Sequence, residues 1–195
     1  MKNMLVIAAS AAALLVPASA GAQAIPPGVI AVVDLNTVTA TCNACKTALA
    51  ALNSKKAGLD SRARALSTPL ETEQKSIQAA VDALKGAEPD AALQARAKAW
   101  ETKRQAAAQE MTRAQDQAQR DQAYIQKQIG DKLGPIYSQV MTKRGANVLM
   151  EVGSTLATSQ SIDVTADVLA ALNAALPTIV TTAPAAPAQQ KPQGR

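Results

Sequence analysis

The fold is decided by residues 49–84, LAALNSKKAGLDSRARALSTPLETEQKSIQAAVDAL, in which apolar residues recur every third or fourth position. Two series of positions, each with a spacing of seven, carry them: Leu49, Ala63, Leu70, Ile77 and Leu84 in the first, Leu52, Leu59 and Leu66 in the second. Only Lys56 interrupts the first series. A seven-residue repeat of this length is typical of a coiled coil, although an ordinary amphipathic helix is the alternative. The stretch therefore predicts a long helix that needs a partner helix.

The partner helix is predicted after a break at residues 85–90, KGAEPD, where Gly86 can end one helix and Pro89 can open the next. The apolar pattern then resumes at Leu93, Ala97, Trp100, Ala107, Met111, Ala114 and Ala118, and shifts register to Ile125, Ile129, Leu133, Ile136 and Val140. A short turn between two long helices makes them antiparallel neighbours. The sequence thus predicts a coiled-coil hairpin arm over residues 37–144, with its turn near 85–91. Pro69 and Pro135 fall inside the helices and are expected to bend them.

Short apolar runs flank the hairpin. Residues 29–35, VIAVVDL, and 146–153, ANVLMEVG, read as buried strands, and residues 155–160 are expected to add a third short one. A final helix is predicted over 165–173, capped by Thr165.

Strands at both ends of a hairpin imply a small sheet built from distant parts of the chain. Residues 29–36 together with 145–176 are therefore predicted to form a β/α head. Two or three strands in one chain leave exposed sheet edges. We expect these edges to be covered by other copies of the chain in a closed oligomer. The fold class is mainly α with a small β head, in which the hairpin projects from a strand-built oligomerisation domain.

The two termini have compositions of their own. Residues 1–22 combine Lys2, an apolar run from 4 to 16 and small residues at 18–22, which is the pattern of a secretory signal peptide. Residues 177–195 are rich in Pro and Ala without a burial pattern and are expected to be a disordered tail. A short, simple signal and only two cysteines point to the periplasm of a Gram-negative bacterium.

Composition and charge narrow the function classes. The chain has no His, and no glycine-rich phosphate loop or acid pair in an apolar pocket pattern is visible, so we expect no enzyme and no cofactor. The pI of about 9.4 keeps nucleic-acid binding as an alternative, but export and the scarcity of aromatic residues argue against it. Residues 37–144 contain 17 Lys and Arg against 11 Asp and Glu, so acidic unfolded chains would be attracted to the arm.

Cys42 and Cys45 form a Cys-x-x-Cys motif in TCNACK, residues 41–46. Two thiolates without His cannot complete a zinc site in one chain, and six pooled in a trimer are a remote alternative, so no metal is predicted. A thioredoxin-like site would need a βαβ context, most of which is missing. Cys42 does follow a strand and lie at the start of a helix, so a redox site stays an alternative; the favoured interpretation is a structural disulfide, closed within the chain or between protomers.

In its order of elements the chain resembles the Skp (OmpH-like) family of periplasmic chaperones. The resemblance covers about residues 29–175. It depends on the order of five features along the chain: a signal peptide, the segment IAVVDLNTV, the hairpin, the segment RGANVLMEV and the ending IDVTADVLAALN. It implies a jellyfish-like homotrimer with a β-barrel head and three arms around a cavity. Such a protein would hold unfolded outer-membrane proteins without ATP and prevent their aggregation before membrane insertion.

The resemblance and the arm pattern together suggest partners and a client-binding surface near the tip. Its candidate residues are Ile77, Val81, Leu84, Leu93, Arg96, Trp100, Lys103 and Arg104. Expected partners are unfolded outer-membrane proteins and further copies of the chain, with peripheral association to a membrane surface and no nucleic acid. The turn itself has one Lys, one Glu and one Asp, unlike the strongly basic arm tips of well-known members, which puts electrostatic capture there in doubt. Alternatives are a structural envelope coiled coil and, less favoured, a thiol-redox protein.

Overall fold

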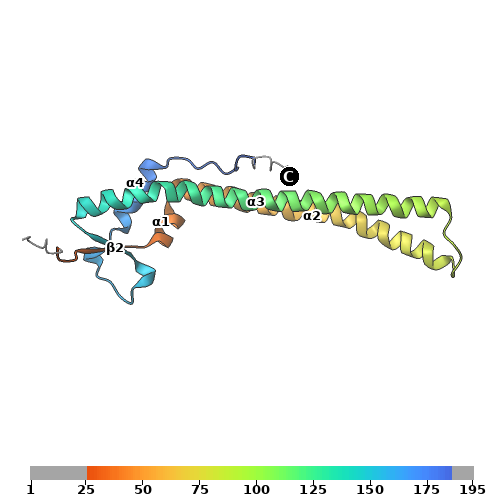
Figure 1. Ribbon diagram of the computed structural model, residues 1–195, viewed down its shortest axis with the longest axis horizontal. Helices are drawn as coiled ribbons and strands as arrows, with labels where there is room; N and C mark the ends of the chain where they lie inside the picture. The colour runs from red at the N-terminus through yellow and green to blue at the C-terminus, as the bar shows by residue number, and fades with distance from the viewer. Residues whose placement is uncertain (1–25, 186–195) are drawn as a thin grey trace, which may run out of the picture.

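The computed structural model describes residues 26–185 (Figure 1). Its elements, in chain order, are β1 (Ile30–Val33), α1 (Leu35–Thr41), α2 (Asn43–Ala83), α3 (Ala91–Arg144), β2 (Val148–Glu151), the short 3-10 helices η1 (Val152–Ser154) and η2 (Gln160–Ile162), and α4 (Thr165–Ala175). The predicted signal peptide, residues 1–22, and the end of the predicted tail, residues 186–195, lie outside the described residues.

Figure 1 shows α2 and α3 as a long antiparallel hairpin projecting from a small head, which is the predicted architecture. The 41 and 54 residues of these helices correspond to roughly 60 and 80 Å at about 1.5 Å per residue. The turn contains Lys85 and Gly86, both with positive φ, and Asp90 caps α3 by accepting a hydrogen bond from the Leu93 N–H at 2.7 Å. Pro69 and Pro135 lie inside helices that continue through them.

The heptad seam is confirmed along most of the hairpin. Both predicted series on α2 are half-buried from Leu52 to Leu84, and the series on α3 is half-buried or buried. Leu49 is the exception, because it is 56% exposed while Ala48 beside it is buried. Near the head the inward-facing positions are Cys45, Ala48 and Leu52, so the seam there has rotated by one residue relative to the strict repeat.

The arm was predicted to start at residue 37, but its first helix, α2, starts at Asn43 after a break at Cys42. The residue has φ −59° and ψ 140°, an extended conformation that ends α1 and begins α2. The Cys42 Sγ accepts a hydrogen bond from the Cys45 N–H at 3.0 Å, so the break is also the cap of the arm helix. The chain can therefore change direction between the head and the arm.

The head sheet has two parallel strands, β1 and β2, with Ile30 opposite Val148 and Val33 opposite Glu151. The expected third strand at 155–160 is not formed; η1 precedes that segment, η2 begins at its last residue, and Val32 instead makes an isolated bridge with Asp163. Local hydrogen bonds explain the difference, since the Ser159 Oγ accepts from the Ser161 N–H and competes with strand pairing.

Thr165 does not cap the final helix as predicted. Its hydroxyl accepts a hydrogen bond from the Asp34 N–H at 2.9 Å, which ties α4 to the end of β1. Asp163 instead accepts from the Thr165 N–H at 2.8 Å, and α4 extends two residues beyond the predicted 173.

The core lies where the base of the hairpin meets the head. It is built mainly of β-branched and aliphatic side chains from β1, α1, α3 and α4, together with the two cysteines. Its members are Ala31, Val33, Val38, Cys42, Cys45, Leu133, Ile136, Val140, Val164, Val168, Leu172 and Leu176. Distant parts of the chain thus share one core at the root of the arm.

Residues 177–185 differ from the expected disordered tail. They leave α4 and run back along the hairpin, as Figure 1 shows for the segment that leads to the C-terminus. Ile179 packs against the head core, and Val180, Thr181 and Ala183 bond to hairpin side chains. We call residues 177–185 the strap. Composition missed it because its contacts are hydrogen bonds to particular side chains, which leave no apolar period in the sequence.

Candidate functional site

The apolar residues suggested for client binding divide into two groups. Ile77, Leu84 and Leu93 are half-buried in the seam, and the last two line a groove of about 420 Å³ at the tip together with Arg96. Val81 is 41% exposed and lies outside that groove. The tip therefore offers a shallow groove with both apolar and charged walls, Glu88 and Asp90 among the latter, and a separate exposed valine.

Trp100 joins the two helices below the tip. Its indole N–H donates to the Leu70 carbonyl at 2.9 Å, and the ring is half-buried. The Arg104 guanidinium carbon lies 5.8 Å from the ring centroid, within the range of a cation–π contact. Trp100 thus fixes the spacing of the helices and presents only part of its surface to a ligand.

Two of the three basic candidates are held in ion pairs. Arg96 bonds Glu73 of α2, with its Nε 2.6 Å from one carboxylate oxygen, and Arg104 bonds Glu101 at 2.8 Å. The hydrogen bonds from Arg104 and from Gln105 lower the pKa of Glu101 to about 2, and the bond from Arg96 lowers the pKa of Glu73. Lys103 has no ion pair among the described residues. The positive charge that the tip can offer a client is correspondingly smaller than the sequence suggests.

A second groove lies between the helices at the level of Trp100. It has a volume of about 290 Å³, and its walls are mostly apolar; Ala65, Leu66, Pro69, Leu70, Lys103, Ala106, Ala107 and Glu110 line it. Pro69 has no N–H, so the Ala65 carbonyl lacks its usual helical donor. Lys103 was predicted from the sequence as a client-binding residue, whereas Pro69 was expected only to bend its helix.

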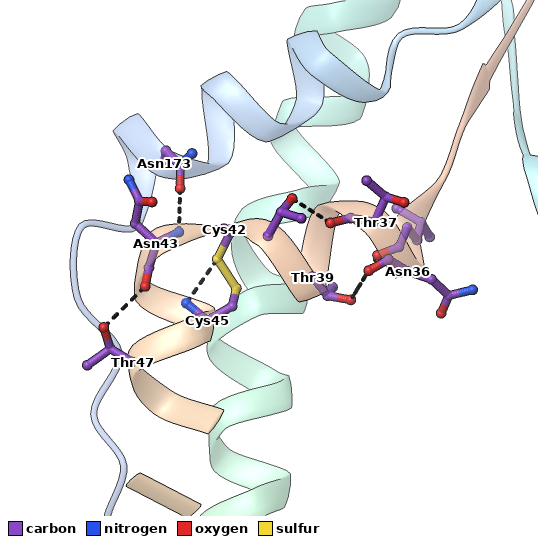
Figure 2. The surroundings of a disulfide bond; sticks show 10 residues. Asn36, Thr37, Thr39, Cys42, Asn43, Cys45, Thr47 and Asn173 are labelled. Atoms are coloured by element: carbon purple, nitrogen blue, oxygen red, sulfur yellow. Dashed lines mark hydrogen bonds between the residues drawn. A yellow bond between two sulfur atoms is a disulfide. The ribbon is translucent and has the colours of Figure 1, made fainter. Parts of the chain in front are cut away.

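Figure 2 shows the second feature singled out by the sequence, the disulfide between Cys42 and Cys45. Both residues are buried, at 0% and 6% exposure. The Asn43 N–H donates to the Asn173 side-chain oxygen of α4 at 2.8 Å, so α4 is attached to the same turn. The bond is closed within one chain and reinforces the junction of α1, α2 and α4.

Replacing Cys42 and Cys45 by Ser is expected to reduce the free energy of unfolding by about 2 kcal/mol, the loop-entropy value for so short a loop. Client holding should be nearly unchanged, because the bond is buried at the head. Urea unfolding checks the first statement, and dilution of a denatured client checks the second. Insulin reduction by the wild type that disappears in the Ser variant would show a redox site instead.

A buried charge that sequence analysis did not single out lies nearer the head. Asp121 of α3 is 2% exposed, and its Oδ2 lies 2.5 Å from the Lys55 Nζ of α2. Burial alone would raise the pKa of Asp121, but bonds from Lys55, the Ala183 N–H and Gln117 lower it below its ordinary value. The sequence does contain a sign that Asp121 is buried, because the residue lies between Ala118 and Ile125 in the apolar series of α3. A charge at that position requires a buried partner.

Two further observations concern the part of the chain that the structure describes. No cluster of three or more His, Cys, Asp or Glu residues suited to a metal ion occurs in residues 26–185. None of the helices there is long and apolar enough to cross a bilayer.

The fold and these grooves define a class: helical-hairpin proteins that project a long arm from a small α/β head. The family model described as "Outer membrane protein (OmpH-like)" matches residues 29–172. The chain belongs to this OmpH-like family.

A crystal structure with the same fold comes from Caulobacter crescentus CB15 and is of a proposed OmpH-like outer membrane chaperone. The two chains are 19% identical, with a TM-score of 0.67, and the similarity covers 87% of this chain and 98% of the other. A comparison with curated proteins gives no match.

Proposed function

We propose that the protein is an ATP-independent holding chaperone of the periplasm, which binds unfolded outer-membrane proteins between the arms of a homotrimer. The observation that supports this most is the hairpin itself. Its helices extend far beyond the head, and their seam is only half-buried along most of the length in the single chain. Family membership and the resemblance to the Caulobacter protein point the same way.

The chemistry of the arm suits many different clients. Its seam is rich in Ala, its grooves at Leu84–Leu93 and Pro69–Lys103 are shallow, and several of its charges are already paired across the hairpin. Such a surface makes weak contacts in many arrangements and requires no single pose, which favours promiscuous binding. The remaining excess of Lys and Arg would attract acidic segments.

The function is tested by diluting a urea-denatured outer-membrane β-barrel protein into buffer with and without stoichiometric chaperone. Light scattering should stay near baseline with the protein present, without ATP. A structural envelope coiled coil, the second candidate, would leave aggregation unchanged. The periplasmic location rests on the predicted signal peptide and is tested by fractionation of cells.

The mature protein is expected to be a trimer of about 50 to 55 kDa with an elongated shape. The supporting feature is one face of the head sheet, on which the strand register places Ile30, Val148 and Met150, each 36–45% exposed. These apolar side chains are left in contact with water in the single chain, and other protomers would cover them. Multi-angle light scattering at micromolar concentrations measures the mass; a monomer or dimer would contradict the trimer.

A further inference from the structure

The strap is bound to the hairpin largely through its main chain. Gln128 of α3 donates its amide to the Val180 carbonyl at 2.8 Å and accepts from the Val180 N–H at 3.0 Å. The Thr181 carbonyl accepts from Lys55 at 2.5 Å, and the Ala183 N–H donates to Asp121 at 2.8 Å. Only one strap side chain, Thr182, joins in, through a bond from Lys55 at 3.0 Å. These contacts depend little on which residues the strap contains.

The side chains that bind the strap also bond to one another. Asp121 is nearly fully buried, and Gln117 donates to its Oδ1 at 2.7 Å and to the Ala183 carbonyl at 3.3 Å. Lys55 supplies the opposite charge from α2. A buried carboxylate costs free energy, because its charge is removed from water. An Ala or Leu at the position of Asp121 would complete the seam between the helices without that cost. The donors and acceptors around Asp121 are suited to recognising an extended main chain.

The same face of the hairpin continues beyond the strap. Lys103 and Glu110 precede Gln117 by two and one steps of seven residues, so they share its face of α3. The Arg62–Glu110 ion pair crosses the helices there, and the groove lined by Pro69 and Lys103 follows it. In Figure 1 the strap runs along the hairpin in this direction. An extended chain could therefore follow one path from Gln128 to the groove at Lys103.

Building on the holding function proposed above, we propose that Lys55, Gln117, Asp121 and Gln128 form a binding site for the main chain of an extended polypeptide segment. The strap is its resident occupant, and an unfolded outer-membrane protein segment replaces it and continues into the groove at Pro69 and Lys103. The occupant and the client compete, since both offer the same alternation of N–H and carbonyl groups. The strap is attached to the site, so its effective concentration is of millimolar order and it lowers the apparent affinity for clients.

The test uses the full chain with the paired changes Val180→Pro and Ala183→Pro. Each proline removes a strap N–H that bonds to the hairpin and leaves every hairpin residue in place. Ala185→Pro is the matched control, because the Ala185 N–H donates no hydrogen bond within residues 26–185. We expect the double variant to bind a denatured outer-membrane protein about three- to tenfold more tightly than the wild type, and the control to equal the wild type.

A second probe is an acetylated, amidated and fluorescent peptide with the sequence of residues 177–185. It should bind the double variant measurably better than the wild type in fluorescence polarisation. Adding Gln128→Ala should weaken that binding on the order of tenfold, since two hydrogen bonds are lost. Gln126→Ala, an exposed glutamine on the same helix, should leave it unchanged. If the double variant does not fold, a chain that stops after Ile179 replaces it in the same measurements. That chain keeps the packing of Ile179 on the head core.

The outcomes separate this site from the holding function. If the double variant binds neither peptide nor client better than the wild type, the strap is only a structural brace and the site is overturned, while holding by the wild type still stands. If no variant holds a client but the peptide binds in a Gln128-dependent manner, the site stands and the holding function fails.

Discussion

A chain without residues 60–116, in which a short turn joins Leu59 to Gln117, is expected to form a trimeric head and to lose nearly all client holding. The core at the root of the arm lies outside the deletion, because its arm residues are Cys45 on α2 and Leu133, Ile136 and Val140 on α3. Leu59 and Ala118 line one groove, so the two stumps are close enough to be joined. Holding should fall because the grooves at Leu84–Leu93 and Pro69–Lys103 are removed.

The shortened chain retains the strap and all four groups beneath it, namely Lys55, Gln117, Asp121 and Gln128. A client could still replace the strap there, but without the groove at Pro69 and Lys103 the contact is too short to restore holding. Light scattering of a diluted, denatured client measures holding by the shortened chain. Multi-angle light scattering measures whether that chain is a trimer. If the shortened trimer still kept a denatured client soluble, the arms would not be the holding surface, and a site on the head would have to replace them.

High salt should not reproduce the effect of the deletion. At about 1 M salt the Debye length is near 3 Å, so attraction of acidic clients to exposed Lys residues is screened. Apolar contacts with Ile77, Leu84, Leu93 and Trp100 are not weakened by salt. A partial loss of holding is therefore expected for the full-length chain in salt, compared with a nearly complete loss on deletion.

The sequence predicted the hairpin because its signal is periodic and local. Apolar residues seven apart on two neighbouring stretches give the helix, its buried face and its partner without knowledge of distant contacts. The prediction that Leu49 belongs to the seam was wrong, because the seam near the head follows Cys45 and Ala48, which the head core covers. Tertiary packing there overrides the strict repeat.

The strap and its site could not be predicted, because they depend on pairs far apart in the chain. Lys55 and Asp121 are 66 residues apart, and Gln128 is 52 residues from Val180. Pro, Ala and Thr in the tail give no burial pattern of their own. The candidate basic residues were found, yet their pairing was not, since Glu73 meets Arg96 only after the hairpin has closed.

Leu172→Ala should be the most destabilising single change considered, reducing the free energy of unfolding by about 2–5 kcal/mol. Leu172 of α4 is fully buried, in a core shared with α1, α3 and the Cys42–Cys45 turn. The truncation leaves a cavity where these elements meet, and the neighbouring β-branched side chains cannot easily fill it. Since α4 lies in the head, the variant should also lose trimer at lower temperature than the wild type. Urea unfolding at one fixed protomer concentration measures the change, because oligomer stability depends on concentration.

Leu49→Ala is the matched control, because the same atoms are removed from a side chain that is 56% exposed in the single chain. It should cost about 1 kcal/mol or less. A cost equal to that of Leu172→Ala would mean that Leu49 is buried in the assembled protein. The Leu49 side chain would then be covered by a neighbouring protomer at the base of the arms.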